Sequence, residues 1–265
     1  MTAWQFFSKP DRYCAPCGDL RCAVTECRIS PSPAFMRGVT ALFISDVHAL
    51  PTTADAAMTA LKEKAAALKP DLVLLGGDYS DRPGPAERLF ERLAAIPATL
   101  GRFGVVGNND REAFPEIGRL RRIMSRAGFE LLINESRSLR LGGGRLTVAG
   151  LDEYRYGAPD AAGLYARTPA PDRFRLLLSH YPRRVEPMPD LMLCGHTHGG
   201  QFNLLGVTPY TVGFERLFAR RRASCFIAGL HPLNGGQVLV SKGIGASRLP
   251  LRVGVRPEIN FIRFD

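Results

Sequence analysis

The sequence predicts an α/β fold in which two mixed β-sheets pack face to face and helices cover their outer faces. The first observation is a series of strand–helix units over residues 39–127, where short apolar runs alternate with amphipathic segments. The second is the later half of the chain, which consists mostly of short strands separated by turns. The hydrophobic content of 45% is ordinary for a chain that buries a core. Strand–helix units followed by runs of strands favour stacked layers.

One domain accounts for the whole chain. At 265 residues the chain suits one large domain with a sizeable core, and it contains no internal repeat and no linker. We expect residues 39–265 to form the body of this domain. Residues 1–38 form an N-terminal segment of the same domain, with an edge strand at residues 21–28 and a Ser-Pro-Ser-Pro loop at residues 30–33.

Three strands alternate with three helices in the first half. Each strand is a short apolar run, and each helix places apolar side chains three or four residues apart on one face. The first helix carries Met58, Leu61 and Ala65 on that face and ends before Pro70, which cannot continue it. The expected strands cover residues 39–45, 72–75 and 101–106, and the expected helices cover residues 54–69, 85–95 and 112–127.

Short strands dominate the second half. A glycine turn at residues 142–144 indicates a hairpin between two of them. Clusters of Gly and Pro predict loops at residues 157–171 and 195–209. The expected strands cover residues 130–133, 138–141, 145–149, 174–179, 191–193, 226–230, 237–241 and 258–264.

Side chains that bind metals follow five of the apolar runs. A buried strand presents such side chains at its carboxyl end, where parallel strands meet at one edge of a sheet. A lone Asp or His at a strand end is more often a cap or a loop residue. Five such ends in one chain instead predict a shared site with enough ligands for two metal ions. The candidate metal ligands are Asp46, His48, Asp78, Asn108, His180, His196 and His198.

The types and spacing of these residues favour particular metals. Asp46 and His48 are two residues apart, so an extended backbone would point both to the same side. Asp78 follows two glycines that permit a sharp turn, and its two carboxylate oxygens suit a position shared by two cations. Mixed imidazole and carboxylate ligands favour Mn, Fe or Zn over Mg or Ca.

The order of these motifs resembles that of the calcineurin-like metallophosphoesterase superfamily, from residue 39 to the C-terminus. The resemblance implies a four-layer α/β/β/α sandwich and a phosphoesterase that attacks phosphorus with a metal-bound hydroxide. It also implies two divalent metal ions as cofactors. The first ion would be held by Asp46, His48, Asp78 and His198, and the second by Asp78, Asn108, His180 and His196.

Within the superfamily, the chain looks most like a branch of bacterial phosphodiesterases with a Gly-His-Thr-His-Gly-Gly-Gln motif, present at residues 195–201. Residues 240–247 match this branch as well. The resemblance implies a phosphodiester or pyrophosphate substrate. Some members of the wider group cleave the pyrophosphate of a UDP-linked, acylated glucosamine, so a lipid-linked substrate of the UDP-diacylglucosamine type is an alternative.

One motif departs from the superfamily pattern. The third motif of the superfamily usually reads Gly-Asn-His followed by Asp or Glu. At residues 107–110 this chain has Asn109 in place of the His, followed by Asp110. We take Asn109 and Asp110 as the candidate catalytic residues. Asn109 cannot act as a general acid, although its amide can donate a hydrogen bond. We therefore expect substrates with good leaving groups, and a non-catalytic metal-binding scaffold is the alternative.

The charge of the chain bears on its partners. A formal net charge of +10 favours an anionic substrate or an acidic membrane surface. Residues 213–222 form a basic amphipathic segment that suits peripheral contact with an anionic membrane, or else a solvated face packed on the sheet. Nucleic acid is disfavoured, because the arginines lack interleaved stacking aromatics. The sequence shows no transmembrane run and no secretory signal, so we expect a cytoplasmic protein, with the inner face of the membrane as an alternative location.

The remaining cysteines and the fifth histidine fall outside these motifs. Cys194 and Cys225 read as core thiols. The N-terminal cysteines begin as C-x2-C without a second close pair, so reduced thiols are favoured over a metal site or a disulfide; they are Cys14, Cys17, Cys22 and Cys27. His231 is expected at the surface or in a local hydrogen bond.

Overall fold

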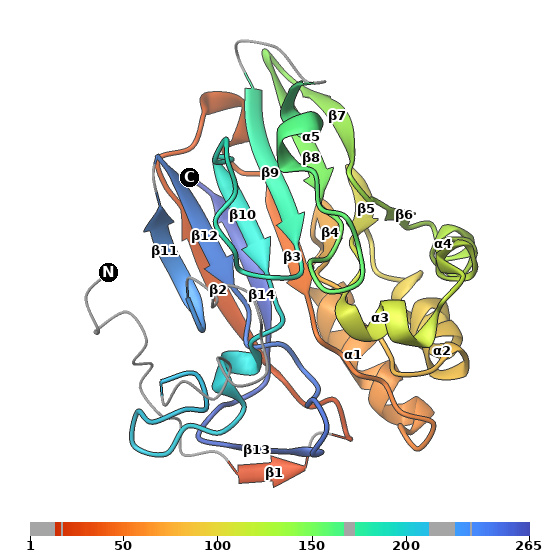
Figure 1. The fold of residues 1–265 in the computed structure, drawn as a ribbon. Helices are drawn as coiled ribbons and strands as arrows, with labels where there is room; N and C mark the ends of the chain where they lie inside the picture. Colours follow the sequence, from red (N-terminus) through yellow and green to blue (C-terminus); the bar gives the residue numbers. More distant parts are fainter. Residues whose placement is uncertain (1–13, 17, 167–172, 212–225, 234) are drawn as a thin grey trace.

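Two six-stranded β-sheets pack against each other in the computed structural model, and helices cover their outer faces (Figure 1). The structure describes residues 14–16, 18–166, 173–211, 226–233 and 235–265. The predicted α/β/β/α sandwich is confirmed by this arrangement. The basic segment at residues 213–222 and Cys17 and Cys225 lie outside the described residues.

The first sheet has the strand order β2-β14-β3-β4-β5-β6. Strands β3 to β6 are parallel to one another, whereas β14 is antiparallel to β3 and parallel to β2 at the edge. Four consecutive parallel strands bring their carboxyl ends to one edge of the sheet. The strands are β2 (Ala23–Ile29), β3 (Thr40–Ile44), β4 (Leu72–Leu75), β5 (Gly101–Gly104), β6 (Glu130–Leu131) and β14 (Glu258–Phe264).

The second sheet has the order β11-β12-β10-β9-β8-β7. Its four central strands are parallel, and the antiparallel strands β11 and β7 close its edges. Figure 1 shows β3, β9 and β10 pointing to the same end of the molecule. The strands are β7 (Glu135–Leu141), β8 (Gly144–Gly150), β9 (Arg173–Ser179), β10 (Leu191–Cys194), β11 (Gly229–Leu233) and β12 (Gly236–Val240).

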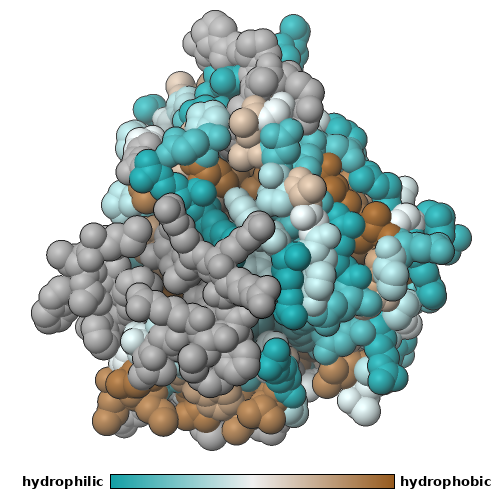
Figure 2. Space-filling view, viewed as in Figure 1, coloured by the Kyte–Doolittle hydropathy of each residue, from teal (hydrophilic) through white to brown (hydrophobic). Residues whose placement is uncertain are grey.

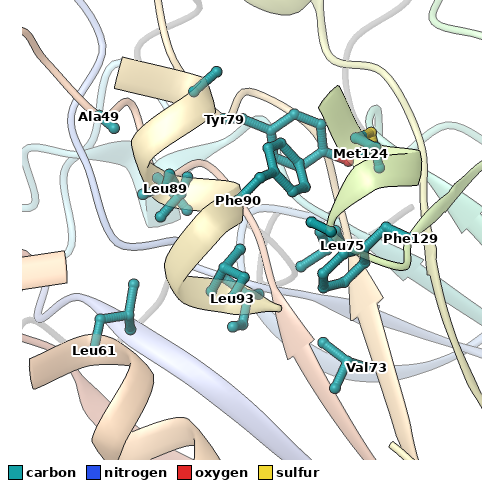
Figure 3. Packing of buried hydrophobic residues seen from close by; sticks show 14 of the residues in the cluster. Ala49, Leu61, Val73, Leu75, Tyr79, Leu89, Phe90, Leu93, Met124 and Phe129 are labelled. Carbon is teal, nitrogen blue, oxygen red and sulfur yellow. The ribbon is translucent and has the colours of Figure 1, made fainter. Parts of the chain in front are cut away.

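Three apolar layers hold the sandwich together. Side chains such as Phe43 and Leu178 fill the space between the sheets, since alternate residues of the facing strands point inward. Phe90 packs edge-on against Tyr79 and Phe129 beneath the helices on the first sheet (Figure 3). Leu164 packs on the outer face of the second sheet. The helices are α1 (Asp55–Ala67), α2 (Pro83–Leu93), α3 (Asn108–Ala113), α4 (Ile117–Arg126), α5 (Ala161–Ala166), η2 (Ala34–Met36) and η3 (His198–Gly200).

The predicted helix at residues 112–127 is wrong in its extent, because the structure contains two helices there. Helix α3 already begins at Asn108, and Pro115 separates it from α4. Proline disfavours helical backbone in the preceding residue, and Phe114 accordingly has φ −128° and ψ 76°. Because α3 starts early, the candidate site residues Asn108, Asn109 and Asp110 lie in its first turn.

Three other predictions need correction. The strand expected at residues 226–230 lies further along as β11, and Phe226 and Ile227 are instead buried ahead of it. Helix α5 occupies part of the segment expected to be a loop at residues 157–171. A two-stranded ribbon of β1 (Cys14–Pro16) and β13 (Leu251–Val253) was not predicted, because three-residue strands leave no periodic pattern.

Exposed aliphatic side chains gather near this ribbon. The bridge between Phe202 and Val253 joins the loop after η3 to β13. Figure 2 shows hydrophobic residues along the lower edge of the molecule, where β1 and β13 lie in Figure 1. The exposed side chains on these two segments are Leu204, Leu205, Val207, Leu249 and Leu251. No helix of the described residues is long and apolar enough to span a membrane.

Candidate metal centre

The loops after β3 and β4 continue the pairing of these strands beyond their ends. The backbone N–H of Asp46 donates to Gly77 at 3.0 Å, and that of His48 donates to Asp78 at 3.0 Å. The loop after β10 docks on the same edge, because the His196 N–H donates to the Asp46 carboxylate at 2.9 Å. Strand ends of both sheets therefore meet at one site.

All seven predicted metal ligands lie at this site. One oxygen of Asp78, Oδ2, lies 3.4 Å from Nε2 of His48 and 3.4 Å from Nε2 of His180. His180 Nε2 is also 3.3 Å from Nδ1 of His196. These contacts place Asp78 between two halves of the cluster.

The remaining ligands complete the two halves. His198 Nε2 lies 3.6 Å from Asp46 Oδ1, on the side of His48. Asn108 Nδ2 donates to Asn109 at 3.0 Å, so its carbonyl oxygen is left to accept from the Tyr181 hydroxyl at 3.2 Å, on the side of His180. The ligand atoms form two compact groups, and within each group all atoms lie within 4.8 Å of one another. The groups are Asp46, His48 and His198, and Asp46, Asp78 and His180.

The distances fit a metal centre. Ligand bonds of about 2.0–2.2 Å place neighbouring ligand atoms roughly 3.0–3.6 Å apart around one ion. The spacings between His48, His180 and Asp78 fall in this range. Moreover, His48 Nε2 is buried and has no hydrogen-bond partner among the described residues. A buried nitrogen without a partner is costly unless a cation binds it.

The surroundings of three histidines fix their orientation. Nδ1 of His48 contacts the Asp81 carboxylate at 3.1 Å, and Nδ1 of His180 contacts the Gly76 carbonyl at 2.8 Å. Nδ1 of His198 lies 3.1 Å from the Arg252 guanidinium, which can only donate, and 3.4 Å from the Gly245 carbonyl. In His48 and His180 a proton on Nδ1 leaves the Nε2 lone pair free, and metal-binding histidines are typically held in this way.

Several of the candidate ligands have left-handed backbone conformations. Asp46, His48, Asp78, His196 and His198 have φ between 44° and 71°. Asp46 and His48 therefore lie in a turn, so the expected extended backbone at this point is wrong. Left-handed residues other than glycine cost about 1–3 kcal/mol and persist where the surrounding structure enforces them, most often at functional sites.

Two glycines allow the loops after β4 and β5 to touch. Gly77 has φ +89°, and a Cβ there would lie 2.5 Å from the Gly107 nitrogen. A Cβ on Gly107 would collide with the Asp78 carboxylate. The absence of side chains at both positions brings Asp78 next to the start of α3.

Asp110 ties these two loops together. Its carboxylate accepts hydrogen bonds from the backbone N–H groups of Asp78 at 2.7 Å, Tyr79 at 2.9 Å and Gly107 at 2.8 Å. Asp110 is fully buried. This predicted catalytic residue thus contacts backbone rather than the open side of the site. Asn109 lies nearer the ligands, with its amide nitrogen 3.3 Å from Nδ1 of His48.

Burial and neighbouring charges shift the pKa values at the site in opposite directions. Burial lowers the pKa of His196 to about 3, and it lowers that of His198 well below its usual value. Burial also disfavours charge on His180, but the Asp78 carboxylate outweighs this and raises the pKa of His180 to about 10. Burial, with the Asp78 charge beside it, raises the pKa of Asp110 to about 7. Metal binding would have to displace a proton from His180.

Three residues at the site were not predicted from sequence. Asp81 contacts His48, and the ring of Tyr181 lies 3.9 Å from that of His196. Arg252 is fully buried and donates to the carbonyl oxygens of Gly245 at 2.7 Å and His198 at 3.1 Å. Asp81 lies three residues after Asp78, and Tyr181 directly follows His180. This proximity to candidate ligands could have indicated both residues from sequence. Arg252 is distant in sequence: the segment 252–258 resembles the bacterial branch, but this resemblance did not indicate a contact with His198.

The other expectations concern residues away from the site. Nε2 of His231 donates to the Ala228 carbonyl at 2.7 Å, and the His231 ring stacks on Phe226, so the predicted local hydrogen bond is confirmed. Cys22, Cys27 and Cys194 are buried, and none of them forms a disulfide among the described residues. Burial raises the pKa of the Cys22 and Cys27 thiols to about 11, which keeps both protonated.

Comparison with known proteins agrees with this geometry. The sequence profile described as calcineurin-like phosphoesterase matches residues 39–200, which carry all seven predicted metal ligands. The chain belongs to the calcineurin-like phosphoesterase family. The matched part contains the strands of both sheets that end at the metal centre.

Several members of the family are similar over most of the chain. The metallophosphoesterase YkuE of Bacillus subtilis, described as uncharacterized, is 30% identical over 72% of this chain and 66% of its own length. The phosphodiesterase YaeI of Escherichia coli is 29% identical over 83% of this chain and 80% of its own length. The chain thus spans about two thirds of the first protein and more of the second.

A solved structure shares the fold. The sulfate thiohydrolase SoxB of Thermus thermophilus superposes with a TM-score of 0.50 at 16% identity, covering 85% of this phosphoesterase and 57% of SoxB. At this identity the likeness concerns the fold alone.

Removing the charge of Asp110 tests its role between the loops. We expect Asp110→Asn to leave a backbone N–H without an acceptor, because the new amide group offers one oxygen in place of two. The free energy of unfolding should fall by about 1–3 kcal/mol, as measured by urea denaturation. Bound metal, measured by elemental analysis, should fall with it. The exposed Glu116, which caps no N–H at the start of α4, provides the control Glu116→Gln. Unchanged stability of Asp110→Asn would contradict this role.

Proposed function

We propose that this phosphoesterase is a two-metal phosphodiesterase or pyrophosphatase. The observation that supports this most directly is the position of Asp78, whose Oδ2 lies equally far from a histidine of each half of the cluster. A carboxylate in that position suits two cations at once. The name of the relative YaeI, a phosphodiesterase, agrees with a diester substrate.

The donor atoms divide into two sets. Each set combines carboxylate or amide oxygen with imidazole nitrogen, which suits Mn, Fe or Zn. Two divalent ions bound there would polarise phosphoryl oxygens and lower the pKa of a bound water molecule. We assign Asp46, His48, Asp78 and His198 to one ion and Asp78, Asn108, His180 and His196 to the other. Asp46 also has a ligand atom within 4.8 Å of those of Asp78 and His180, so it lies near both ions.

The other residues of the site hold these ligands or face the substrate. Asp110 fixes the backbone of Asp78, and Arg252 holds the backbone of His198. The Asn109 amide nitrogen lies at the edge of the first set, 3.3 Å from Nδ1 of His48. In this role the amide would donate a hydrogen bond to a phosphoryl oxygen of the substrate. No acidic proton is available from Asn109, so the leaving group must depart with little protonation. A phenolate or a phosphate of a pyrophosphate meets this condition.

A catalytic role explains the site better than a scaffold role. A scaffold without catalytic demand gains nothing from retaining seven ligands, several of them in left-handed conformations with a cost in stability. Substitution of the usual histidine by Asn109 alters proton transfer and leaves these ligands in place.

Metal dependence is the first test. We expect the protein with Mn²⁺ to hydrolyse bis-p-nitrophenyl phosphate and to lose this activity in a chelator. Asp78→Asn should lower kcat by about 100-fold or more, because a bound ion stabilises the transition state by several kcal/mol. Elemental analysis should show about two ions per chain in the wild type and fewer in Asp78→Asn. Asp55→Asn, in the exposed first turn of α1, is the control. Hydrolysis that survives chelation would refute the proposal, and full metal content without turnover on any ester would favour the scaffold.

Restoring a histidine tests the leaving-group argument. We expect Asn109→His to raise the hydrolysis of glycerophosphocholine, whose alkoxide needs a proton, by about 10²–10⁴-fold. The rate on bis-p-nitrophenyl phosphate should change far less, because p-nitrophenolate leaves unprotonated. Asn109→Gln retains an amide and serves as the control. An equal gain on both substrates would count against a missing general acid.

A lipid-linked substrate at the inner face of a membrane is a second candidate. It is supported by the exposed aliphatic side chains near β13, which are connected to the site. Gln201 donates to the carbonyl oxygens of Leu249 and Leu251, and Arg252 lies between these residues and His198. An apolar surface beside a metal centre, in a chain of net charge +10, suits an anionic lipid surface.

Vesicle binding tests this candidate. We expect the protein to float with vesicles of phosphatidylcholine and phosphatidylglycerol. The double variant Leu205→Gln and Leu249→Gln should bind at least about 10-fold more weakly, since two leucines would no longer be buried in lipid. Leu230→Gln, on the edge strand β11, is the control. Absence of binding by the wild type would exclude this candidate while leaving the phosphoesterase proposal intact.

A further inference from the structure

Arg183 lies near the candidate metal centre, beside two tyrosine rings that contact each other edge-on, with 5.9 Å between their centres. Its guanidinium carbon lies 5.3 Å from the centre of the Tyr181 ring and 4.8 Å from that of Tyr154. The other neighbour of Tyr181 is His196, at 3.9 Å between ring centres. Tyr181 thus connects the candidate ligand His196 to both Tyr154 and Arg183.

Arg183 differs from the other arginines on this side of the site. Arg111 forms an ion pair with Asp152 at 2.6 Å, and Arg155 lies 3.9 Å from Glu112. Arg184, the next residue, pairs with Glu186 at 2.7 Å. Arg183 has no carboxylate partner among the described residues.

The buried carboxylate of Glu153, in the same loop as Tyr154, already has hydrogen-bond partners. Glu153 precedes Tyr154 and accepts hydrogen bonds from the backbone N–H groups of Arg155 and Tyr156. It therefore stabilises its own turn and does not neutralise Arg183. The charge of Arg183 is left for a group from outside the described residues.

The loops that carry this arrangement frame the site. Tyr154 belongs to the loop after β8, and Tyr181 and Arg183 belong to the loop after β9 (Figure 1). The ion pair between Arg111 and Asp152 ties the first of these loops to α3, which begins at the ligand Asn108. The ion pair and the contacts with the two tyrosines therefore fix the position of Arg183 relative to the candidate metal ligands.

We propose that Arg183 binds a second phosphoryl group, adjacent to the one that is hydrolysed, and that the substrate is therefore a diphosphate diester. This inference rests on the proposed phosphoesterase function and chooses the pyrophosphate over the simple diester. A guanidinium stacked on aromatic rings keeps its N–H edges free, and these match two phosphoryl oxygens at once. Stacking also limits the side-chain motion that would be lost on binding.

The choice of substrate agrees with Asn109. When a diphosphate is cleaved, the leaving group is a phosphate monoester, whose negative charge needs little protonation. A cation that contacts this leaving phosphoryl group assists its departure. The lack of a general acid and the presence of Arg183 thus both favour cleavage of the bond between two phosphoryl groups.

Comparing the affinities for two nucleotides measures the contribution of the second phosphoryl group to binding. AMP and α,β-methylene-ADP share the nucleoside and first phosphoryl group, and the methylene bridge of the latter resists hydrolysis. Isothermal titration of the Mn²⁺-loaded full chain should give α,β-methylene-ADP an affinity about 10-fold or more above that of AMP, as expected for a charge-assisted hydrogen bond. In Arg183→Gln the two affinities should become nearly equal. Arg183→Lys should retain part of the difference, and Arg184→Gln should retain all of it.

The ratio of affinities separates this role from a structural one. If Arg183 only packs the two tyrosines, Arg183→Gln will weaken both nucleotides equally, and the inference is overturned. Equal affinities in the wild type would overturn it as well. Because binding requires no turnover, loss of the ratio in Arg183→Gln supports the inference even if no ester is hydrolysed. Conversely, hydrolysis of bis-p-nitrophenyl phosphate with an unchanged ratio upholds the proposed function and rejects this substrate class.

Discussion

The carboxylate of Asp110 gathers three backbone N–H groups from the loops that follow β4 and β5, and the position of Asp78 depends on these hydrogen bonds. The contact is possible because Gly77 and Gly107 leave no side chain between the loops. Once Asp78 is fixed, its Oδ2 faces one histidine from each half of the cluster. A residue with no contact to the outside thus determines the geometry of the metal centre.

Electrostatics explains why such a site calls for cations. Asp46, Asp78 and Asp110 are all buried, and burial of a carboxylate without compensation is strongly unfavourable. Part of the compensation comes from His180, whose pKa is raised to about 10 beside Asp78. Divalent ions would supply the rest, and His48 Nε2, buried without a hydrogen-bond partner among the described residues, is ready to bind one. Left-handed backbone at five ligands indicates that the fold gives up stability to arrange them.

Two residues near the candidate metal centre, Asn109 and Arg183, bear on which substrate the site accepts. Asn109 provides an amide where the superfamily pattern, as read from sequence, has a histidine. Arg183 lies over the adjacent rings of Tyr154 and Tyr181, with no carboxylate partner in the described structure. Both features place the demand on the leaving group rather than on a protein acid. Both features support the proposal that the bond between two phosphoryl groups is the one cleaved.

The sequence by itself predicted the layered fold and the seven candidate ligands that the structure brings together, because apolar runs mark buried strands and their carboxyl ends mark the edge where such side chains collect. It did not determine the boundary between α3 and α4, where Pro115 outweighs the apolar pattern, or the ribbon of β1 and β13. Arg252 and Arg183 could not be recognised, because an arginine in a sequence reads the same whether it is solvated, paired or stacked. Their roles depend on neighbours far away in the chain, such as His198 for Arg252 and Tyr154 for Arg183. Only the tertiary structure brings such neighbours together, since local sequence carries no record of contacts made across two sheets.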